Sequence, residues 1–223
     1  MKTLHLLPNI LHEESTWEFC PPHVDALIAE SEKGGYTYLK RFRLPQLPLY
    51  LLNEHTASPH ELVRLSEESV GLISDAGLPC LADPGAQLVS AARERGVAVK
   101  AYPGPSSIVL ALMLSGLPAQ TFLFHGYLER EKAELEKQIR QLAKGITHVF
   151  IEAPYRNHRL LETLLKTLAP DDQLCVCWNL TAPDEQVISQ PVKAWKNLPD
   201  IQKKPAVFVL KKAAGFGLVE RKR

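Results

Sequence analysis

Two loops rich in glycine, proline and hydroxyl side chains follow apolar segments in the first half of the chain. Residues 74–79 read Ser-Asp-Ala-Gly-Leu-Pro, and residues 103–107 read Pro-Gly-Pro-Ser-Ser. Open α/β sheets bind ligands beyond the carboxyl ends of their strands, so we expect the two loops to be neighbours. A helix starting at Ser106 and Ser107 would present exposed backbone N–H groups and hydroxyls to a carboxylate or phosphate. The alternative is a well-capped helix without a ligand, because serine is common at helix starts.

Two carboxylates flank Gly77. Asp75 and Asp83 could together chelate Mg²⁺ or hydrogen-bond a ribose. Aspartate is also a frequent turn residue, and for Asp83, which precedes Pro84 and Gly85, capping of the next helix is the favoured interpretation.

A third candidate lies in the second half, directly after the apolar segment 147–151. Glu152 and Arg156 place an acid and a base where a strand would end, an arrangement suited to general acid/base chemistry. The alternative is an ion pair between these two side chains that orders the turn.

Several chemistries lack a supporting pattern. The eight histidines show no HExxH and no repeated ligand spacing, so no metal site is expected. There is no G-x-S-x-G nucleophile elbow. The Gly-Phe-Gly at 215–217 lies too close to the end of the sequence to open the helix of a dinucleotide fingerprint. The cysteines form no CxxC pair and are expected to be free thiols, with Cys175 and Cys177 buried on one face of a strand.

Composition sets the broad class. The chain has 223 residues, 45% hydrophobic and 23% charged, with a formal net charge of +1. This balance provides no global basic field, so any binding of nucleic acid requires a local patch. No apolar run approaches the ~18 residues that span a bilayer, and the apolar start is too short for a signal peptide. We therefore expect a cytoplasmic protein without membrane contact.

Prolines and glycines punctuate an alternation of strand and helix patterns that is typical of an α/β protein. Strands are predicted at 4–7, 49–52, 70–73, 97–102, 147–151, 173–178, 186–189 and 206–210. Helices are predicted at about 22–30, up to 41, from 58, between 85 and 96, up to 115, and at about 130–144 and 157–168. A shift in composition after Leu117 predicts two α/β domains, 1–117 and 118–223, that share a cleft.

Five motifs in order resemble the tetrapyrrole methylase superfamily. They are the loops 74–79, 82–85 (Ala-Asp-Pro-Gly) and 103–107, followed by Phe124-His125-Gly126-Tyr127-Leu128 and Glu152-Ala153-Pro154-Tyr155-Arg156. The resemblance is strongest to a branch of 2'-O-ribose methyltransferases that act on small-subunit ribosomal RNA. It implies a two-domain class III methyltransferase, usually a homodimer, with S-adenosyl-L-methionine bound in the cleft between the domains.

The resemblance also implies the residues that bind the cofactor. They are Pro8, Asp75, Ala76, Gly77, Leu78, Leu81, Ser106, Ser107, Glu152, Ala153, Leu180, Thr181, Pro205 and Ala206. Gly77 would let the backbone approach the cofactor closely.

Three segments depart from the pattern of this branch. The N-terminal signature is reduced to Leu7-Pro8-Asn9-Ile10-Leu11, without its glycine. The segment Ala29-Glu30-Ser31-Glu32-Lys33 keeps the glutamate but replaces the residues after it. Leu180-Thr181-Ala182 stands where the branch has Leu-Thr-Lys. The sequence also shows no counterpart of the small C-terminal helical domain of the longer enzymes. We therefore expect fewer residues that bind RNA.

The function expected from the resemblance is methyl transfer to a ribose hydroxyl of ribosomal RNA. Because the sulfonium methyl is already activated, catalysis would consist mainly of positioning, with Glu152 or Glu30 as the base. Arg130, Lys132 and Arg156 are the expected RNA contacts. The alternatives are a methyltransferase that acts on a tetrapyrrole or another small metabolite, and a degenerate protein that binds the cofactor without turnover.

Overall fold

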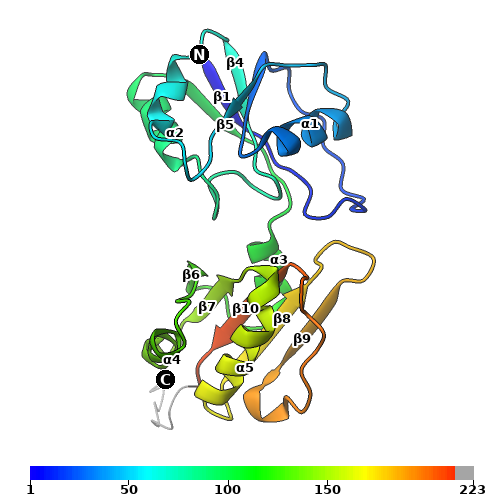
Figure 1. The fold of residues 1–223 in the computed structure, drawn as a ribbon, viewed down its shortest axis with the longest axis vertical. Helices are drawn as coiled ribbons and strands as arrows, with labels where there is room; N and C mark the ends of the chain where they lie inside the picture. Colours follow the sequence, from blue (N-terminus) through cyan, green and yellow to red (C-terminus); the bar gives the residue numbers. More distant parts are fainter. Residues whose placement is uncertain (214–223) are drawn as a thin grey trace, which may run out of the picture. The chain divides into compact units, whose positions relative to one another are not determined.

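The computed structural model describes residues 1–213, which form two compact units, Met1–Ser106 and the chain from Ser107 onward. Figure 1 shows a sheet with flanking helices in each unit, which confirms the predicted α/β class. The Gly-Phe-Gly segment at 215–217 lies outside the described residues.

The first unit is a parallel five-stranded sheet in the order β3-β2-β4-β1-β5. Its strands are β1 (Thr3–Leu6), β2 (Ala26–Ala29), β3 (Leu49–Leu51), β4 (Ser69–Leu72) and β5 (Ala98–Ala101). The connections contain helix α1 (Glu32–Arg41), the 3₁₀ helix η1 (Pro59–Arg64) and helix α2 (Ala86–Glu94). Since all strands are parallel, their carboxyl ends lie at one edge of the sheet.

Alternating side chains of β2 build the two cores of this unit. Leu27 belongs to the core that contains Tyr38 and Leu39 of α1. Ile28 belongs to the core formed with α2 and η1, which includes Leu88. The sheet is therefore covered on both faces, by α1 on one and by α2 and η1 on the other.

Two predicted helices of this unit are wrong. Residues 22–30 do not form a helix but contain β2, whose four residues are all buried. A strand buried on both faces has a continuous apolar pattern that cannot be told from a short buried helix. The segment after Ser58 forms only a 3₁₀ helix, and the Ser58 side chain makes no capping hydrogen bond.

The second unit is a mixed five-stranded sheet in the order β6-β7-β10-β8-β9. Its strands are β6 (Phe122–Tyr127), β7 (Thr147–Ile151), β8 (Gln173–Trp178), β9 (Gln186–Pro191) and β10 (Ala206–Lys211). β6 and β7 are parallel, and the other neighbouring pairs are antiparallel. Its helices are α3 (Ser107–Ser115), α4 (Lys132–Gln141) and α5 (Asn157–Thr167), with short 3₁₀ helices at Pro154–Arg156 and Val192–Ala194.

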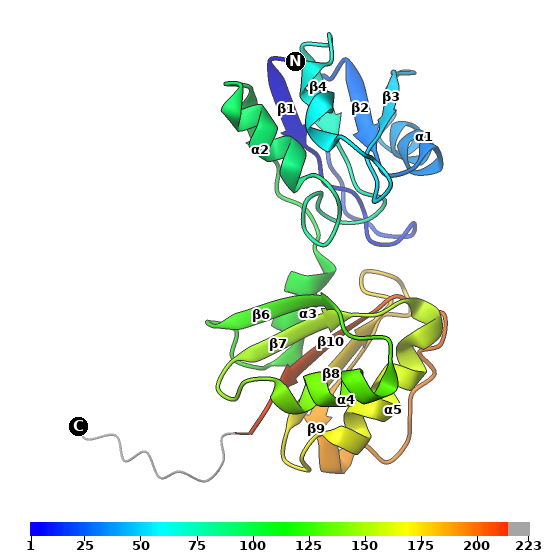
Figure 2. The same ribbon diagram turned by 60° about the vertical axis from the view of Figure 1, so that its left-hand side comes forward.

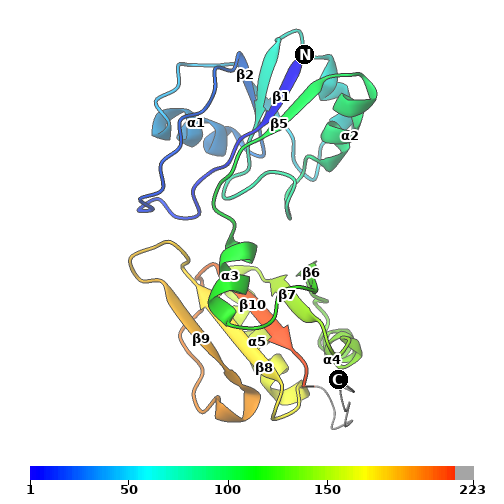
Figure 3. The ribbon, with the colours of Figure 1, turned by 180° about the vertical axis from the view of Figure 1, so that it is seen from behind.

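Helices cover both faces of this second sheet. α4 and α5 lie over one face (Figure 2), where their side chains pack with Val176 and Phe208. α3 lies over the other face (Figure 3) and contacts β8, β9 and β10. Cys175 and Cys177 are both buried free thiols on the same side of β8, with their Sγ atoms 3.6 Å apart, as the alternation predicts.

The division between the units falls before α3, whereas composition placed it after Leu117. α3 packs on the second sheet through Ile108, Ala111 and Leu112. Because its sequence is apolar on nearly every side, no periodicity in it indicates which sheet it covers. In the part of the chain that the structure describes, no helix is long and apolar enough to cross a membrane.

Candidate functional site

Residues at the carboxyl edge of the first sheet form the first group of candidates. Pro8 and Asn9 follow β1, Glu30 and Ser31 follow β2, the loop 74–79 follows β4, and the loop 103–107 follows β5. The parallel topology gathers segments that are far apart in sequence at this edge.

Asn9 ties the segment after β1 to the loop after β4. Its backbone N–H donates to the carbonyl oxygen of Gly77 at 2.8 Å, and the Gly77 N–H donates to the Ile10 carbonyl at 3.3 Å. The Asn9 side-chain amide donates to the carbonyls of Ser74 and Asp75, both at 3.0 Å. Sequence reasoning missed this buried side chain, although its position a few residues after a strand was a usable signal.

The loops after β4 and β5 are neighbours, as predicted. Gly77 has a φ of 74°, and a Cβ atom there would lie 3.6 Å from the carbonyl oxygen of Pro105. A Cβ atom on Gly104 would lie 2.1 Å from Cβ of Pro8 and 3.3 Å from Cδ2 of Leu78. Glycine is required at 104 by this close packing and at 77 by the left-handed backbone.

Ser106 and Ser107 stand at the division between the units. Ser106 is buried, and α3 begins at Ser107, so the predicted helix start is confirmed.

Glu30 is a partly buried carboxylate at the same edge, and its Oε1 atom is buried without a hydrogen-bond partner among the described residues. Burial, followed by the charges of Asp83 and Asp75, raises the pKa of Glu30 from 4.5 to about 7. A carboxylate with a pKa close to neutrality is suited to accept a proton under physiological conditions.

Asp75 meets the first turn of α1. The hydroxyl of Ser31 accepts from the Gly34 N–H at 2.9 Å, which caps the helix, and donates to the Asp75 carboxylate at 3.3 Å. A Cβ atom on Gly34 would lie 1.9 Å from Oδ1 of Asp75, so glycine is needed for this approach. The carboxylate is favoured there by the positive end of the helix dipole.

Asp83 does not cap α2, contrary to the favoured interpretation. The N-cap is Gly85, which provides no side chain. Burial raises the pKa of Asp83, opposed by the neighbouring Ser74 hydroxyl, and the Asp75 charge raises it further. Asp83 thus contributes negative charge near Glu30 rather than a helix cap.

Two of the leucines that the resemblance assigns to the cofactor lie between non-glycine residues whose backbone is left-handed. Cys80 and Ala82, on either side of Leu81, have φ values of 67° and 76°. Asn179 and Thr181, on either side of Leu180, have φ values of 51° and 70°. Such conformations cost energy and cluster at binding sites, so they mark these two loops independently of any sequence motif.

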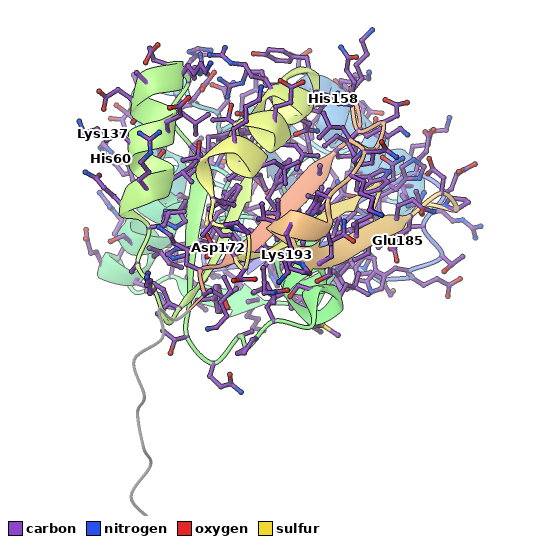
Figure 4. All side chains as sticks on the ribbon, turned by 90° about the horizontal axis from the view of Figure 1, so that it is seen from below. His60, Lys137, His158, Asp172, Glu185 and Lys193 are labelled. Atoms are coloured by element: carbon purple, nitrogen blue, oxygen red, sulfur yellow. The ribbon has the colours of Figure 1, made fainter. Side chains whose placement is uncertain are left out.

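The second group of candidates lies at one edge of the second sheet. Ala206 pairs with Trp178, and Val207 pairs with Ile151. The start of β10 therefore lies beside the ends of β7 and β8. Pro205 precedes β10, Ala153 follows β7 and Leu180 follows β8. The loop after β8 is fixed by hydrogen bonds from the Asn179 N–H to the Pro205 carbonyl at 3.0 Å and from the Thr181 N–H to the carboxylate of Glu185 at 2.8 Å. Figure 4 labels Glu185 in the turn that precedes β9, with Asp172 and Lys193 at the opposite end of the strands. The Thr181 hydroxyl is buried without a described partner.

Glu152 forms the ion pair with Arg156 that the sequence allowed as an alternative to catalysis. Both side chains are largely buried, and the same carboxylate oxygen accepts the Ala153 N–H at 2.6 Å. This oxygen therefore already accepts hydrogen bonds from the Arg156 guanidinium and from the Ala153 N–H.

The remaining candidates are dispersed. Arg130 and Lys132 are exposed at the start of α4, whereas Arg156 is engaged by Glu152. His125 and His148 contact each other, with Nε2 and Nδ1 2.9 Å apart, and His148 also bonds the Ala143 carbonyl. Within residues 1–213, no group of three or more histidine, cysteine, aspartate or glutamate side chains is arranged to hold a metal ion.

The fold and these loops define a methyltransferase-like class. The model of the family of Tetrapyrrole (Corrin/Porphyrin) Methylases matches residues 32–195, and the chain belongs to this family. Among solved structures, it is similar to uroporphyrin-III-C-methyltransferase from Thermus thermophilus, with a TM-score of 0.57 and 20% identity over 95% of each chain. It is also similar to the methyltransferase CobJ, with a TM-score of 0.55 and 16% identity over 86% of this chain and 84% of that one. These likenesses establish the fold.

Curated relatives point to one branch of the family. The chain is 33% identical to ribosomal RNA small subunit methyltransferase I of Bacillus subtilis, over 80% of this chain and 63% of that protein. It is 36% identical to the protein of the same name from Leptospira borgpetersenii, over 75% of this chain and 68% of the relative. Across such relatives, the chain spans about two fifths to two thirds of their length.

Proposed function

We propose that this protein transfers a methyl group from S-adenosyl-L-methionine to the 2'-hydroxyl of a ribose in ribosomal RNA. The observation that carries the proposal is the 30–39% identity to proteins named ribosomal RNA small subunit methyltransferase I. The chain also retains the glycine and hydroxyl loops at the strand ends of the first unit.

The residues present fit the cofactor. Because Gly77 and Gly104 have no Cβ atom, the loops after β4 and β5 can lie close to each other. The buried Thr181 Oγ1 atom lacks a partner among the described residues, and a bound ligand with hydroxyl and amino groups would satisfy it. We assign the cofactor contacts to Pro8, Asp75, Ala76, Gly77, Leu78, Leu81, Ser106 and Ser107 of the first group and to Glu152, Ala153, Leu180, Thr181, Pro205 and Ala206 of the second.

The bound cofactor supplies a methyl group that its sulfonium charge has already activated. The protein then has to hold the ribose hydroxyl in line and accept its proton. We assign proton acceptance to Glu30 rather than Glu152, since the Glu152 carboxylate is occupied by Arg156 and the Ala153 N–H. A Glu30 pKa of about 7 leaves enough of the ionised form at neutral pH.

We further propose that the protein is a cytoplasmic homodimer. Met113 and Leu114 are exposed on α3, and Phe122 and Leu123 are exposed on the edge strand β6. Exposed apolar side chains on a helix and on an open sheet edge are typical of association surfaces, and a second copy of this chain would cover them.

Titration calorimetry with S-adenosyl-L-methionine tests the cofactor. We expect one site per chain in the wild type and none in Gly77→Trp, whose side chain would fill the space beside the Pro105 carbonyl. Gly96→Trp is the matched control, because Gly96 has a similar φ of 70° but open space around its Cβ position. Equal loss in both variants would refute the assignment of the site.

The acceptor is tested with cofactor that carries a labelled methyl group. The proposal requires transfer to the 2'-hydroxyl of small-subunit ribosomal RNA, mapped by nuclease digestion. Methyl transfer to a tetrapyrrole and not to RNA would contradict the proposed acceptor. Tight cofactor binding without transfer to RNA or tetrapyrrole would indicate a degenerate family member.

A further inference from the structure

A cleft of about 950 Å³ lies on the first unit between the segment that follows β1 and the end of α1. Three aromatic side chains line it, Trp17, Phe19 and Phe42, together with the basic side chains of Lys40, Arg41 and Arg43. Neither the sequence motifs nor the cofactor assignment uses these residues.

The three rings form one aromatic cluster. Trp17 and Phe19 are nearly parallel, with centroids 5.6 Å apart and an interplanar angle of 13°. Phe42 meets both edge-on, at 6.4 Å from Trp17 and 6.0 Å from Phe19. Phe19 and Phe42 pack against the core beside α1, whereas Trp17 is not part of that core. Trp17 is therefore the outer ring, a half-exposed indole supported by a rigid base.

The wall that carries Trp17 is held in place by Arg41. Its guanidinium donates to the carbonyl of Glu13 at 2.8 Å and to the carbonyl of Ser15 at 2.9 Å. These two bonds fasten the irregular segment after β1 to the last turn of α1. The cleft is thus shaped before any ligand arrives, which lowers the entropic cost of binding.

Lys40 and Arg43 supply uncommitted positive charge. Both are exposed, and neither side chain forms a hydrogen bond or ion pair with a described residue. Thr37, Lys40 and Arg41 are spaced i, i+3 and i+4 along α1 and so share the helix face that borders the cleft. A cation beside a stacked aromatic group is the usual combination for a nucleotide, because the ring binds the base and the cation binds the phosphate.

The acidic residues of the cleft restrict its charge. Glu13 and Glu18 also line it, which leaves a small positive excess. Stacking must therefore supply most of the binding, and the carboxylates can accept hydrogen bonds from a base with an exocyclic amino group, such as cytosine.

The cleft adjoins the loop assigned to the cofactor. Ile10 lines it, and the Ile10 carbonyl accepts the N–H of Gly77. We propose that this cleft binds an unpaired nucleotide of the RNA substrate, with its base against Trp17 and its phosphate near Lys40 and Arg43. The inference rests on the proposed function and names the surface that would hold the RNA strand beside the site of transfer.

The test uses the full chain and a short fluorescently labelled single-stranded RNA of mixed sequence, with binding followed by anisotropy. Trp17→Ala should weaken binding by at least about tenfold, and Trp17→Phe should retain most of it, because a base stacks on any aromatic ring. Lys40→Ala should reduce the slope of log affinity against log salt by about 1. Arg93→Ala, an exposed charge on α2 across the sheet, should leave both the affinity and the slope unchanged.

Cofactor binding and methyl transfer, measured on the same variants, separate this inference from the proposed function. Wild-type affinity for RNA in both Trp17→Ala and Lys40→Ala, with methylation of RNA by the wild type, would overturn the inference alone. Absence of RNA binding and RNA methylation in the wild type would overturn both. Since Lys40 is exposed, its variant remains informative if Trp17→Ala fails to fold.

Discussion

The backbone N–H of Asn9 donates to the carbonyl of Gly77 at 2.8 Å, which joins the loops that leave β1 and β4. The Asn9 side chain reinforces this junction by satisfying two carbonyls of the β4 loop. A buried amide therefore fixes the shape of the loop in which the glycine is required.

Replacement of Asn9 by alanine should destabilise the protein. It removes three side-chain hydrogen bonds, two donated to the carbonyls of Ser74 and Asp75 and one accepted from the Ile10 N–H. Loss of these partners should cost about 1–3 kcal/mol. Urea unfolding measures this change, and cofactor affinity should fall with it. Gln46→Ala, at an exposed position, is the control and should stay within about 0.5 kcal/mol of the wild type. Equal stability of Asn9→Ala and the wild type would contradict the role of this amide.

Glu30 should make stability fall as the pH rises. Its folded pKa, about 7, exceeds the unfolded value of 4.5, so the stability contributed by the protonated form is complete below 4.5 and lost as the pH rises through 7. Glu30→Gln should therefore match the wild type near pH 4.5 and be more stable at pH 8. Solvent screening limits the gain to about 1–2 kcal/mol. Thermal melts across this range check the sign, and a gain only at acid pH would be inconsistent with it.

The same carboxylate should govern the pH dependence of methyl transfer. If Glu30 accepts the proton, the single-turnover rate of the wild type rises with pH and levels off above about 7. Glu30→Gln should lose about a hundredfold in rate without a change in cofactor affinity. If this variant kept the wild-type rate, Glu30 would not be the proton acceptor, and the ribose proton would pass to solvent.

Much of the fold follows from the sequence, because most elements carry a clear pattern. The strand predicted at 173–178 has the observed bounds of β8, and in the loop predicted at 74–79 Gly77 adopts the left-handed backbone that only glycine tolerates easily. The failures are physical. β2 is buried on both faces and loses its alternation, and the apolar α3 does not reveal which sheet it covers.

The candidate site was only partly predictable for a similar reason. Loops with glycine and serine at strand ends are local patterns that a sequence displays. The contacts of Asn9 join residues more than sixty positions apart, and the Glu30 pKa depends on burial and on Asp83 and Asp75. Neither property can be read from a local sequence pattern, because both depend on which strands are neighbours in the folded sheet.

The ion pair of Glu152 and Arg156 should contribute to stability more than to catalysis. Arg156→Ala leaves a buried carboxylate without its partner and should cost about 3–5 kcal/mol. The double variant Glu152→Gln, Arg156→Ala should recover part of this loss, which a double-mutant cycle in urea measures. Additive losses would show that the pair is not coupled.

Homodimer formation should depend on the exposed apolar face of α3. Met113 is 72% exposed, so Met113→Glu should leave the folded monomer intact while it introduces a charge at the surface proposed to contact a second copy. Sedimentation velocity should show a dimer for the wild type and a monomer for this variant. Leu198→Glu is the matched control, because Leu198 is an exposed leucine of the same unit that lies outside α3 and β6. A dimer that survives Met113→Glu would exclude α3 as the interface, and dissociation of both variants would attribute the effect to charge alone.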